Sequence, residues 1–263
     1  MKSINGYLTK LAADYFISYG TTEKTKIDTS VDALKKGIKL NFGNDLIEIK
    51  TFGSYDRGTM LPRRIDSMSD VDIMIVFDHE RLNILPESYR QKLIRYADTS
   101  YTRSGTKLDF PTVRVDLTHV ILDLVPTIKN SLWGNYQIPD KNNRWMTTDP
   151  SGFTNDLESK NTNNGSVVKP VIRLLKAWNS ANGYPYESFQ LEKIIAGKSF
   201  WAKNIEEDFF AVIDNNLSSW DLSTQTAKDR LNVFKNTIRN VRDYLKNDDE
   251  ENAKLWLHRV LPK

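Results

Sequence analysis

The chain is organised around a glycine turn and a strand that carries two carboxylates. Segment 52–59, Phe-Gly-Ser-Tyr-Asp-Arg-Gly-Thr, follows an apolar run and is typical of a strand that ends in a tight turn. Segment 70–77, Asp-Val-Asp-Ile-Met-Ile-Val-Phe, is the most strand-like run in the sequence. Side chains two apart in a strand share a face, so Asp70 and Asp72 are predicted to point the same way, about 6.6 Å apart along the strand.

Each of these two features has an ordinary and a chemical interpretation. Gly53 and Ser54 form either a common strand-to-helix turn with a serine cap or a cradle of backbone N–H groups for a phosphate. Asp70 and Asp72 either cap a turn and occupy a strand edge or hold divalent metal ions. Aspartate is depleted in strands, so two in one strand need a reason. Found together, the features indicate phosphoryl chemistry on a nucleoside triphosphate.

A third carboxylate is expected from a neighbouring strand, and the sequence offers Asp116 and Asp123. Asp116 shares a strand face with Arg114 and could be ion-paired with it. Asp123 interrupts the apolar run 120–126, where an unpaired charge would be costly unless it met a metal or another partner. We therefore favour Asp123, as a general base or as a group that helps a metal activate the attacking hydroxyl.

Composition excludes several classes of protein. Among 263 residues there is no cysteine, which rules out disulfides and thiolate metal sites and fits a reducing cytoplasm. The first residues lack the apolar core of a signal peptide, and no apolar run reaches the length of a bilayer span, so we expect a cytoplasmic protein with no membrane association. A net charge of +3 without a basic block argues against a stable nucleic-acid partner.

The hydrophobic pattern predicts an α/β first half and a helical second half, with a boundary near residues 150–165. We expect a short helix over 54–61, β-rich runs over 112–118 and 120–125 that form a hairpin or one bent strand, and Pro126 as the end of the second run. The polar, asparagine-rich segment 129–165 is expected to be a long loop region near the domain boundary.

The two motifs at 53–59 and 70–77 resemble the active-site signature of the polymerase-β-like nucleotidyltransferases. Within that superfamily the chain looks most like the bacterial CD-NTases, the SMODS-type cyclic-oligonucleotide synthases of anti-phage (CBASS) signalling, which are relatives of animal cGAS and the oligoadenylate synthases. The block 121–126, Ile-Leu-Asp-Leu-Val-Pro, is similar to the family's third-carboxylate strand and supports Asp123 over Asp116.

The resemblance continues in the second half and spans about residues 45–195. Segment 172–178 resembles the family's long spine helix, and segment 188–192 the start of its next helix. By that match Lys176 and Ser188 bind the donor triphosphate together with Gly53 and Ser54. The spacing of Lys169, Arg173 and Lys176 places them on one helix face, and a solvated basic face is the more common reason for such a pattern. Tyr55, Thr148 and Arg57 are candidate nucleotide contacts.

The resemblance implies an α+β fold, with a mixed β-sheet and flanking helices in the nucleotidyltransferase core and a C-terminal helical lobe. The implied domains are the core with N-terminal helices over 1–160 and the lobe over 161–263, which closes the nucleotide cleft. The implied activity is Mg²⁺-dependent synthesis, with Mn²⁺ as an alternative metal, of a cyclic di- or oligonucleotide second messenger from NTPs. Asp70, Asp72 and Asp123 would be both the catalytic and the metal-binding residues. The expected partners are ATP, GTP or UTP and a regulatory protein, and the expected state is a monomer.

Two other functions are compatible with the same motifs. A template-independent RNA-tailing or CCA-adding transferase shares the glycine turn and the aspartate pair, but the near-neutral charge argues against it. A catalytically silent nucleotide sensor would not need all three carboxylates. The choice of nucleotides, the linkage, the ring size and the mode of activation depend on pocket shape, which the sequence alone does not reveal.

Overall fold

The alternating residues of segment 70–77 form a strand of a mixed sheet, as predicted, and this strand lies between the strands over 46–52 and 121–129. The computed structural model describes residues 2–130 and 134–263, and within them this strand is β2 (Asp70–Phe77). Its alternate residues Val71, Ile73, Ile75 and Phe77 are each 0% exposed. Asp70 and Asp72 lie on the opposite face, so period-2 alternation separates the core side of β2 from its acidic side.

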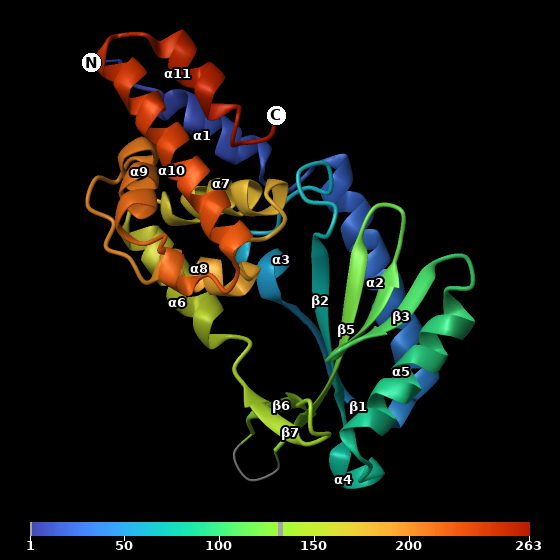
Figure 1. Ribbon diagram of the computed structural model, residues 1–263. Helices are drawn as coiled ribbons and strands as arrows, with labels where there is room; N and C mark the ends of the chain where they lie inside the picture. Colours follow the sequence, from blue (N-terminus) through green and yellow to red (C-terminus); the bar gives the residue numbers. More distant parts are fainter. Residues whose placement is uncertain (1, 131–133) are drawn as a thin grey trace. The chain divides into compact units, whose positions relative to one another are not determined.

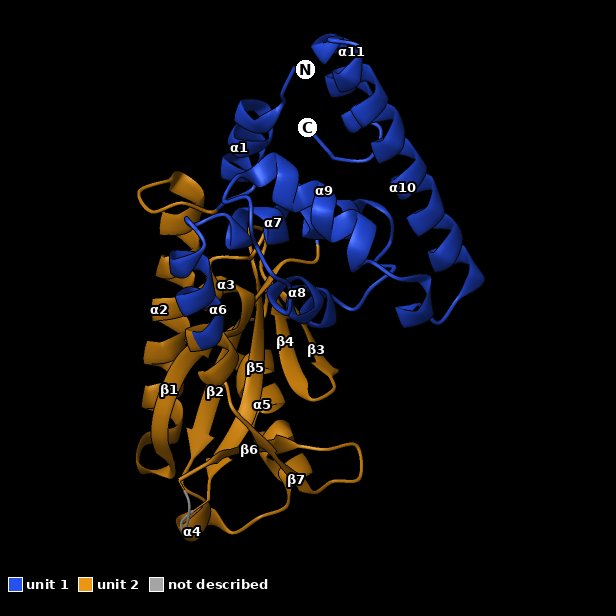
Figure 2. Ribbon diagram, turned by 90° about the vertical axis from the view of Figure 1, so that its left-hand side faces the viewer, with its two compact units in different colours: residues 1–16, 64–67, 156–263 blue, residues 17–63, 68–155 orange. Residues whose placement is uncertain are grey.

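The sheet and its helices form one of two compact units, residues 17–63 and 68–155, here called the sheet unit (Figure 2). Its strands are β1 (Leu46–Phe52), β2, β3 (Gly105–Asp109), β4 (Thr112–Asp116), β5 (Ile121–Lys129), β6 (Tyr136–Pro139) and β7 (Trp145–Thr148). Its helices are α2 (Thr22–Phe42), the 3-10 turn Gly43–Asp45, α3 (Gly53–Arg57), α4 (His79–Leu82) and α5 (Pro86–Ser100).

The strand order in the described part of the sheet is β1-β2-β5-β4-β3, with β6 added to β5 and β7 to β6. The β2 and β5 strands run parallel, and the other pairs are antiparallel. The two β-rich runs at 112–118 and 120–125 thus form a hairpin, β4 and β5, rather than one bent strand. Burying the core face of this sheet requires a helical layer.

Helices α2 and α5 supply that layer and lie against the same side of the sheet (Figure 1). The core joins apolar residues of α2, such as Leu34 and Ile38, to α5 residues such as Leu93 and to the core face of β2. Pro86 at the first turn of α5 has the backbone angle that a helix start needs. The acidic face of β2 is the side away from this helical layer.

Two predicted features of the sheet unit were wrong. Pro126 does not end its strand, because β5 continues to Lys129. The β4 strand pairs with β5 only as far as Leu124, so Pro126 removes no donor needed by β4, while Pro126 still has a register partner, Ile75, on β2. The segment 129–165 is not mainly loop, since it contains the hairpin β6–β7 and helix α6 (Gly152–Asn163).

The second unit, residues 1–16, 64–67 and 156–263, is here called the helical unit. Its helices are α1 (Asn5–Asp14), α6 from Asp156 onward, α7 (Val168–Ala181), α8 (Ser188–Ala196), α9 (Ile205–Asn215), the 3-10 turn Ser219–Asp221, α10 (Gln225–Lys246) and α11 (Glu250–Leu257). The predicted domain boundary at residue 160 lies inside α6, and the first residues of the chain group with the helical unit. None of the helices in the described ranges has the length and apolar character required to cross a bilayer.

Helix α7 is the centre of the helical unit. Its residues 171–179 are all buried, including Arg173 and Lys176, so the predicted basic face of this helix is not a solvated surface. Trp178 is 0% exposed and stacks on Phe234 of α10, with ring centroids 4.4 Å apart and an interplanar angle of 16°. This stacked pair ties α7 to α10.

We predict that Trp178→Ala lowers the free energy of unfolding by about 3–5 kcal/mol, because it leaves a large cavity in a close-packed interior. Trp220→Ala is the matched control, since Trp220 is 94% exposed, and it should change the same quantity by less than about 0.5 kcal/mol. Urea unfolding followed by circular dichroism measures both. Equal effects of the two substitutions would contradict the packing described for α7.

Candidate active site

The glycine turn is formed by Gly53, which directly follows β1 and is the first residue of α3. Gly53 is buried and has φ +76°, a backbone conformation that L side chains rarely adopt. A Cβ atom at this position would lie 2.0 Å from Oδ2 of Asp72. Glycine is therefore required twice, by the backbone angle and by the close approach of the Asp72 carboxylate.

Ser54 follows in the first turn of α3, which spans only five residues, Gly53–Arg57. The helix ends at Gly58, in the left-handed conformation, and so stops earlier than the predicted range 54–61. The Ser54 carbonyl accepts hydrogen bonds from the N–H groups of Thr59 and Met60, at 2.9 and 3.0 Å. These bonds fold the chain back after α3 and fix the turn beside β2.

The three predicted carboxylates lie on one face of two adjacent strands. Asp72 of β2 is in direct register with Asp123 of β5, and Asp70 precedes Asp72 by two residues. Register partners in a sheet project from the same face, so Asp72 and Asp123 are neighbours across the strand pair. The side chain of Asp70 is 30% exposed and that of Asp123 is 6% exposed, so the group extends from the sheet interior toward solvent.

Arg114 of β4 is the cation of this group. It is in register with Asp123, and its Nε and Nη2 donate to the two carboxylate oxygens of Asp123 at 2.9 and 2.6 Å. Nη2 also lies 3.3 Å from Oδ2 of Asp70. Hydrogen bonding to Asp123 raises the pKa of Arg114 above its ordinary value, although burial opposes the shift.

Asp116, the alternative third carboxylate, has a different environment. It is in register with Ile121 rather than with an aspartate, and its side chain is 52% exposed. Its carboxylate pairs with Arg63 at 3.3 Å, not with Arg114 as its position on the strand suggested. Asp123, by contrast, lies next to Asp72, which is the arrangement that a shared site requires.

The donor set of this face fits a divalent cation by its chemistry. Three carboxylates at neighbouring positions of one sheet face are the hard oxygen ligands that Mg²⁺ prefers. In the structure the guanidinium of Arg114 contacts two of them, Asp70 and Asp123. Among the described residues, no three acidic, histidine or cysteine side chains are close enough to hold a metal ion as they stand. The site thus has suitable oxygen ligands, and the positive charge of Arg114 offsets part of their negative charge.

The predicted nucleotide contacts lie in the sheet unit, and two of them, Tyr55 and Arg57, have side chains engaged in other interactions. The Tyr55 hydroxyl donates to Asp28 of α2, and burial together with this carboxylate raises the pKa of Tyr55. Arg57 is 7% exposed and its guanidinium lies 5.3 Å from the ring centroid of Phe153. Thr148 ends β7 opposite Tyr136. Their contacts with nucleotide stay predictions.

The predicted triphosphate ligands of the second half lie in the helical unit. Nζ of Lys176 is 2.8 Å from Oε1 of Glu192 on α8, and their side chains are 7% and 1% exposed. Ser188 is the first residue of α8, where the preceding Glu187 caps the N–H groups of Phe189 and Gln190. The structure thus gives Lys176 an internal partner, and triphosphate binding by Lys176 and Ser188 stays a prediction.

Sequence reasoning missed the pairing of Arg114 with Asp123. The signal lies in the hairpin turn, because the Leu117 N–H donates to the Val120 carbonyl and so sets the register of both strands. Once that turn is known, residue 114 must lie opposite residue 123. The sequence pattern alone did not distinguish a hairpin from one bent strand, so this register was not available.

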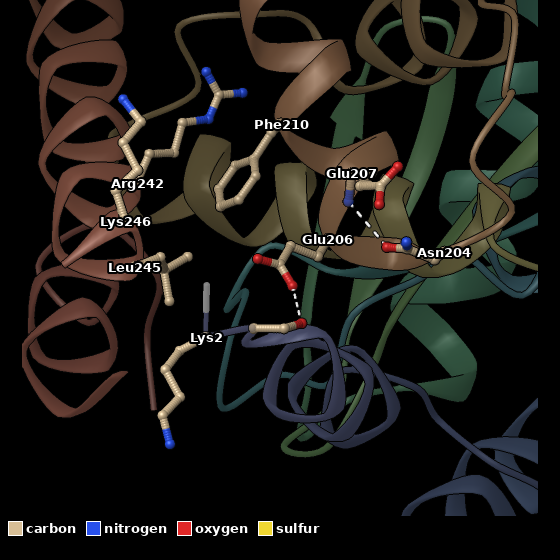
Figure 3. A pocket seen from close by; sticks show the side chains of 9 residues that line it. Lys2, Asn204, Glu206, Glu207, Phe210, Arg242, Leu245 and Lys246 are labelled. Carbon is tan, nitrogen blue, oxygen red and sulfur yellow. Dashed lines mark hydrogen bonds between the residues drawn. The ribbon is translucent and has the colours of Figure 1, made fainter. Parts of the chain in front are cut away.

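The helical unit also contains a pocket of about 350 Å³ (Figure 3). It is lined by residues of the N-terminus, α9 and α10, namely Lys2, Ser3, Asn204, Glu206, Glu207, Phe210, Arg242, Leu245 and Lys246. Arg242 pairs with Asp214 at 2.6 Å and lies over the Phe210 ring, and Glu206 accepts from Ser3. None of the predicted site residues lines this pocket.

Comparison with protein families places the chain among known synthases. Residues 1–161 match the SMODS family, the Second Messenger Oligonucleotide or Dinucleotide Synthetase domain. Over 222 residues the chain is 26% identical to the cyclic AMP-AMP-AMP synthase of Acinetobacter sp. (strain ATCC 27244 / 9458). This match covers 78% of this chain and 62% of the relative, so the chain spans less than two thirds of that protein's length.

Solved structures share the fold at low sequence identity. A chain of the Escherichia coli MS115-1 CdnC:HORMA-deltaN complex has a TM-score of 0.70 and 15% identity, over 97% of this chain and 96% of that chain. The Bradyrhizobium diazoefficiens CD-NTase CdnG in complex with GTP has a TM-score of 0.67 and 14% identity, over 98% of both chains. These similarities confirm the predicted α+β fold.

The chain belongs to the SMODS family of second-messenger nucleotide synthetases, as the family match over most of its length shows. The predicted resemblance to the CD-NTases is thereby confirmed. The glycine turn, the three carboxylates and Arg114 all lie in the sheet unit.

We predict that Gly53→Ala lowers the free energy of unfolding by about 2–4 kcal/mol, through backbone strain and overlap with Asp72. Gly43→Ala is the matched control: Gly43 also has positive φ, at +49°, but an added Cβ there meets nothing within 4 Å. Its cost should be near 1 kcal/mol. Urea unfolding measures both variants.

The overlap can be isolated with a double-mutant cycle. In an Asp72→Ala background the clashing carboxylate is gone and only the 3.2 Å contact with the Cβ of residue 72 remains, so Gly53→Ala should cost clearly less than it does in the wild type. An unchanged cost in that background would show that the Asp72 carboxylate does not restrict position 53.

Proposed function

We propose that the chain is a Mg²⁺-dependent nucleotidyltransferase that joins NTPs into a cyclic di- or oligonucleotide, in anti-phage signalling. The observation that carries the proposal is the in-register pair Asp72–Asp123, with the Gly53 turn against the Asp72 carboxylate. Family membership supports the reaction class. The proposal includes cytoplasmic location, a monomeric chain and Mn²⁺ as an alternative metal.

The reaction is the attack of a 2′- or 3′-hydroxyl of one nucleotide on the α-phosphorus of another. A new O–P bond forms, the bond from the α-phosphorus to the bridging oxygen breaks, and pyrophosphate leaves. Mg²⁺ held by Asp70, Asp72 and Asp123 would supply the positive charge that stabilises the phosphate oxygens. A second transfer with the roles of the two nucleotides exchanged closes the ring.

The chain's own residues have distinct proposed roles. Asp123 accepts the proton of the attacking hydroxyl. Gly53 leaves room for the Asp72 carboxylate beside the turn, because this position has no side chain, and the turn is proposed to present backbone N–H groups to a phosphate. Ser54, Lys176 and Ser188 are proposed to bind the triphosphate, with Lys176 neutralising the leaving pyrophosphate.

Relatives indicate the kind of substrate and partner. The Bradyrhizobium diazoefficiens protein was solved with GTP, and the Acinetobacter relative is named for a product built from AMP units. The Escherichia coli relative was solved as a complex with a HORMA protein. For this chain we propose ATP, GTP or UTP as substrates and a regulatory protein as partner.

We predict that Asp70→Asn with Asp72→Asn lowers product formation at least about a hundredfold. The metal ion that compensates the phosphate charge would lose two of its carboxylate ligands. The measurement is incubation with all four NTPs and Mg²⁺, nuclease treatment and mass analysis of small products. Asp116→Asn is the control, since Asp116 is exposed and pairs with Arg63, and it should retain activity.

Two outcomes would contradict this assignment. Pyrophosphate release by the double variant at the wild-type rate would show that these carboxylates are not catalytic. Extension of added RNA by the wild type, with no small cyclic product, would identify an RNA-tailing enzyme instead.

A separate prediction tests Lys176. Lys176→Met alone should destabilise the chain by about 3–5 kcal/mol, because it leaves the buried Glu192 unpaired. Lys176→Met with Glu192→Leu replaces both charges by apolar groups and should restore stability. If Lys176 binds triphosphate, this folded double variant still has a KM for NTP raised about tenfold or more. A wild-type KM in the double variant would limit Lys176 to a structural role.

A further inference from the structure

Arg114 occupies a position on the carboxylate face that no assigned role explains. It is the middle residue of β4, and the register places Arg114 opposite Asp123, which in turn lies opposite Asp72. One arginine and two aspartates therefore form a row across three neighbouring strands. The side chain of Arg114 is only 13% exposed, so its charge is held mostly within the protein.

The guanidinium makes unequal contacts with its acidic neighbours. It forms a two-pronged pair with Asp123, at 2.9 and 2.6 Å, and that carboxylate is 6% exposed. Its contacts with Asp70 and with Asp109 of β3 are both longer, at 3.3 Å. Asp70 and Asp109 are also more exposed, at 30% and 41%.

The difference in strength between these contacts determines which of them breaks first. A bidentate, charge-assisted pair with a buried carboxylate is strong, and breaking it would leave an uncompensated buried charge. A single longer contact with a partly exposed carboxylate is weak, because water can replace it. Each Asp123 oxygen keeps lone-pair capacity beyond its bond to arginine, so Asp123 can bind another cation without losing Arg114.

We propose that Arg114 is a positioning residue of the transferase site. Arg114 keeps its pair with Asp123 at all times, and it compensates the negative charge of Asp70 only until a divalent cation binds there and replaces that contact. The identity of that cation as a catalytic metal rests on the proposed function. The positive charge of Arg114 weakens cation binding by the protein alone. A triphosphate offsets that charge, so metal binding becomes coupled to nucleotide binding.

The test is the affinity of the protein for Mn²⁺ in the absence of nucleotide, measured by electron paramagnetic resonance. Arg114→Gln should bind Mn²⁺ about tenfold more tightly than the wild type, because one positive charge near the site is lost. Arg114→Lys keeps that charge and should stay near the wild-type affinity. Lys107→Gln is the control: Lys107 is the register partner of Arg114 on β3, but its side chain is 60% exposed and pairs with Asp109.

Thermal unfolding gives an independent readout. Arg114→Gln should melt below the wild type without metal, since Asp123 is left unpaired, and Mn²⁺ should raise its melting temperature more than that of the wild type. A merely structural ion pair would lower the melting temperature without tightening Mn²⁺ binding. Equal or weaker Mn²⁺ affinity in Arg114→Gln overturns the proposal.

A measurement on the wild type covers the case in which Arg114→Gln does not fold. The Nε–H signal of Arg114 in a nitrogen–proton NMR spectrum, assigned by its absence in Arg114→Lys, should persist when Mg²⁺ is added. Its loss on Mg²⁺ addition would mean that the Asp123 pair breaks, which contradicts the proposal.

These results remain separable from the proposed function. If Asp70→Asn with Asp72→Asn leaves Mn²⁺ binding unchanged, the metal lies elsewhere and the proposed catalytic site itself is wrong. If that variant loses Mn²⁺ binding while Arg114→Gln binds as the wild type does, only the role of Arg114 is wrong.

Discussion

The parallel pairing of β2 with β5 is the interaction on which the candidate site depends. Its register sets Asp72 beside Asp123, two residues that are far apart in the sequence. The same pairing sets Ile73 beside Leu124 in the core beneath. One ladder of backbone hydrogen bonds therefore positions both the core residues and the aspartates. The free energy gained by burying apolar side chains on one face offsets the repulsion between the carboxylates on the other.

Local sequence was enough to predict the elements of this site but not all of their partners. The alternation of β2 revealed the shared face of Asp70 and Asp72, and the interrupted apolar run identified Asp123 as a charge that needs a partner. That partner proved to include Arg114, which had been considered for Asp116. The difference depends on hairpin register, a nonlocal property that periodicity does not contain.

Other differences have similar causes. Pro126 was expected to end a strand because proline lacks a ladder donor, yet the neighbouring β4 had already stopped pairing at Leu124. The cations of α7 were expected on one polar helix face, but both Arg173 and Lys176 are buried. Arg173 donates to the Ala12 carbonyl and Lys176 pairs with Glu192, partners that lie outside α7. Helical spacing indicates which residues share a face, while the surroundings of that face depend on tertiary packing.

The two-faced character of β2 has a consequence for how such a chain can diverge. Substitutions on the acidic side leave the apolar side untouched, so new specificities can arise without loss of the core. Insertion or deletion of a single residue within β2 would instead move Val71 or Ile73 to the acidic side and an aspartate into the interior. This strand can therefore accept substitutions on its acidic side during evolution, but not the insertion or deletion of a single residue.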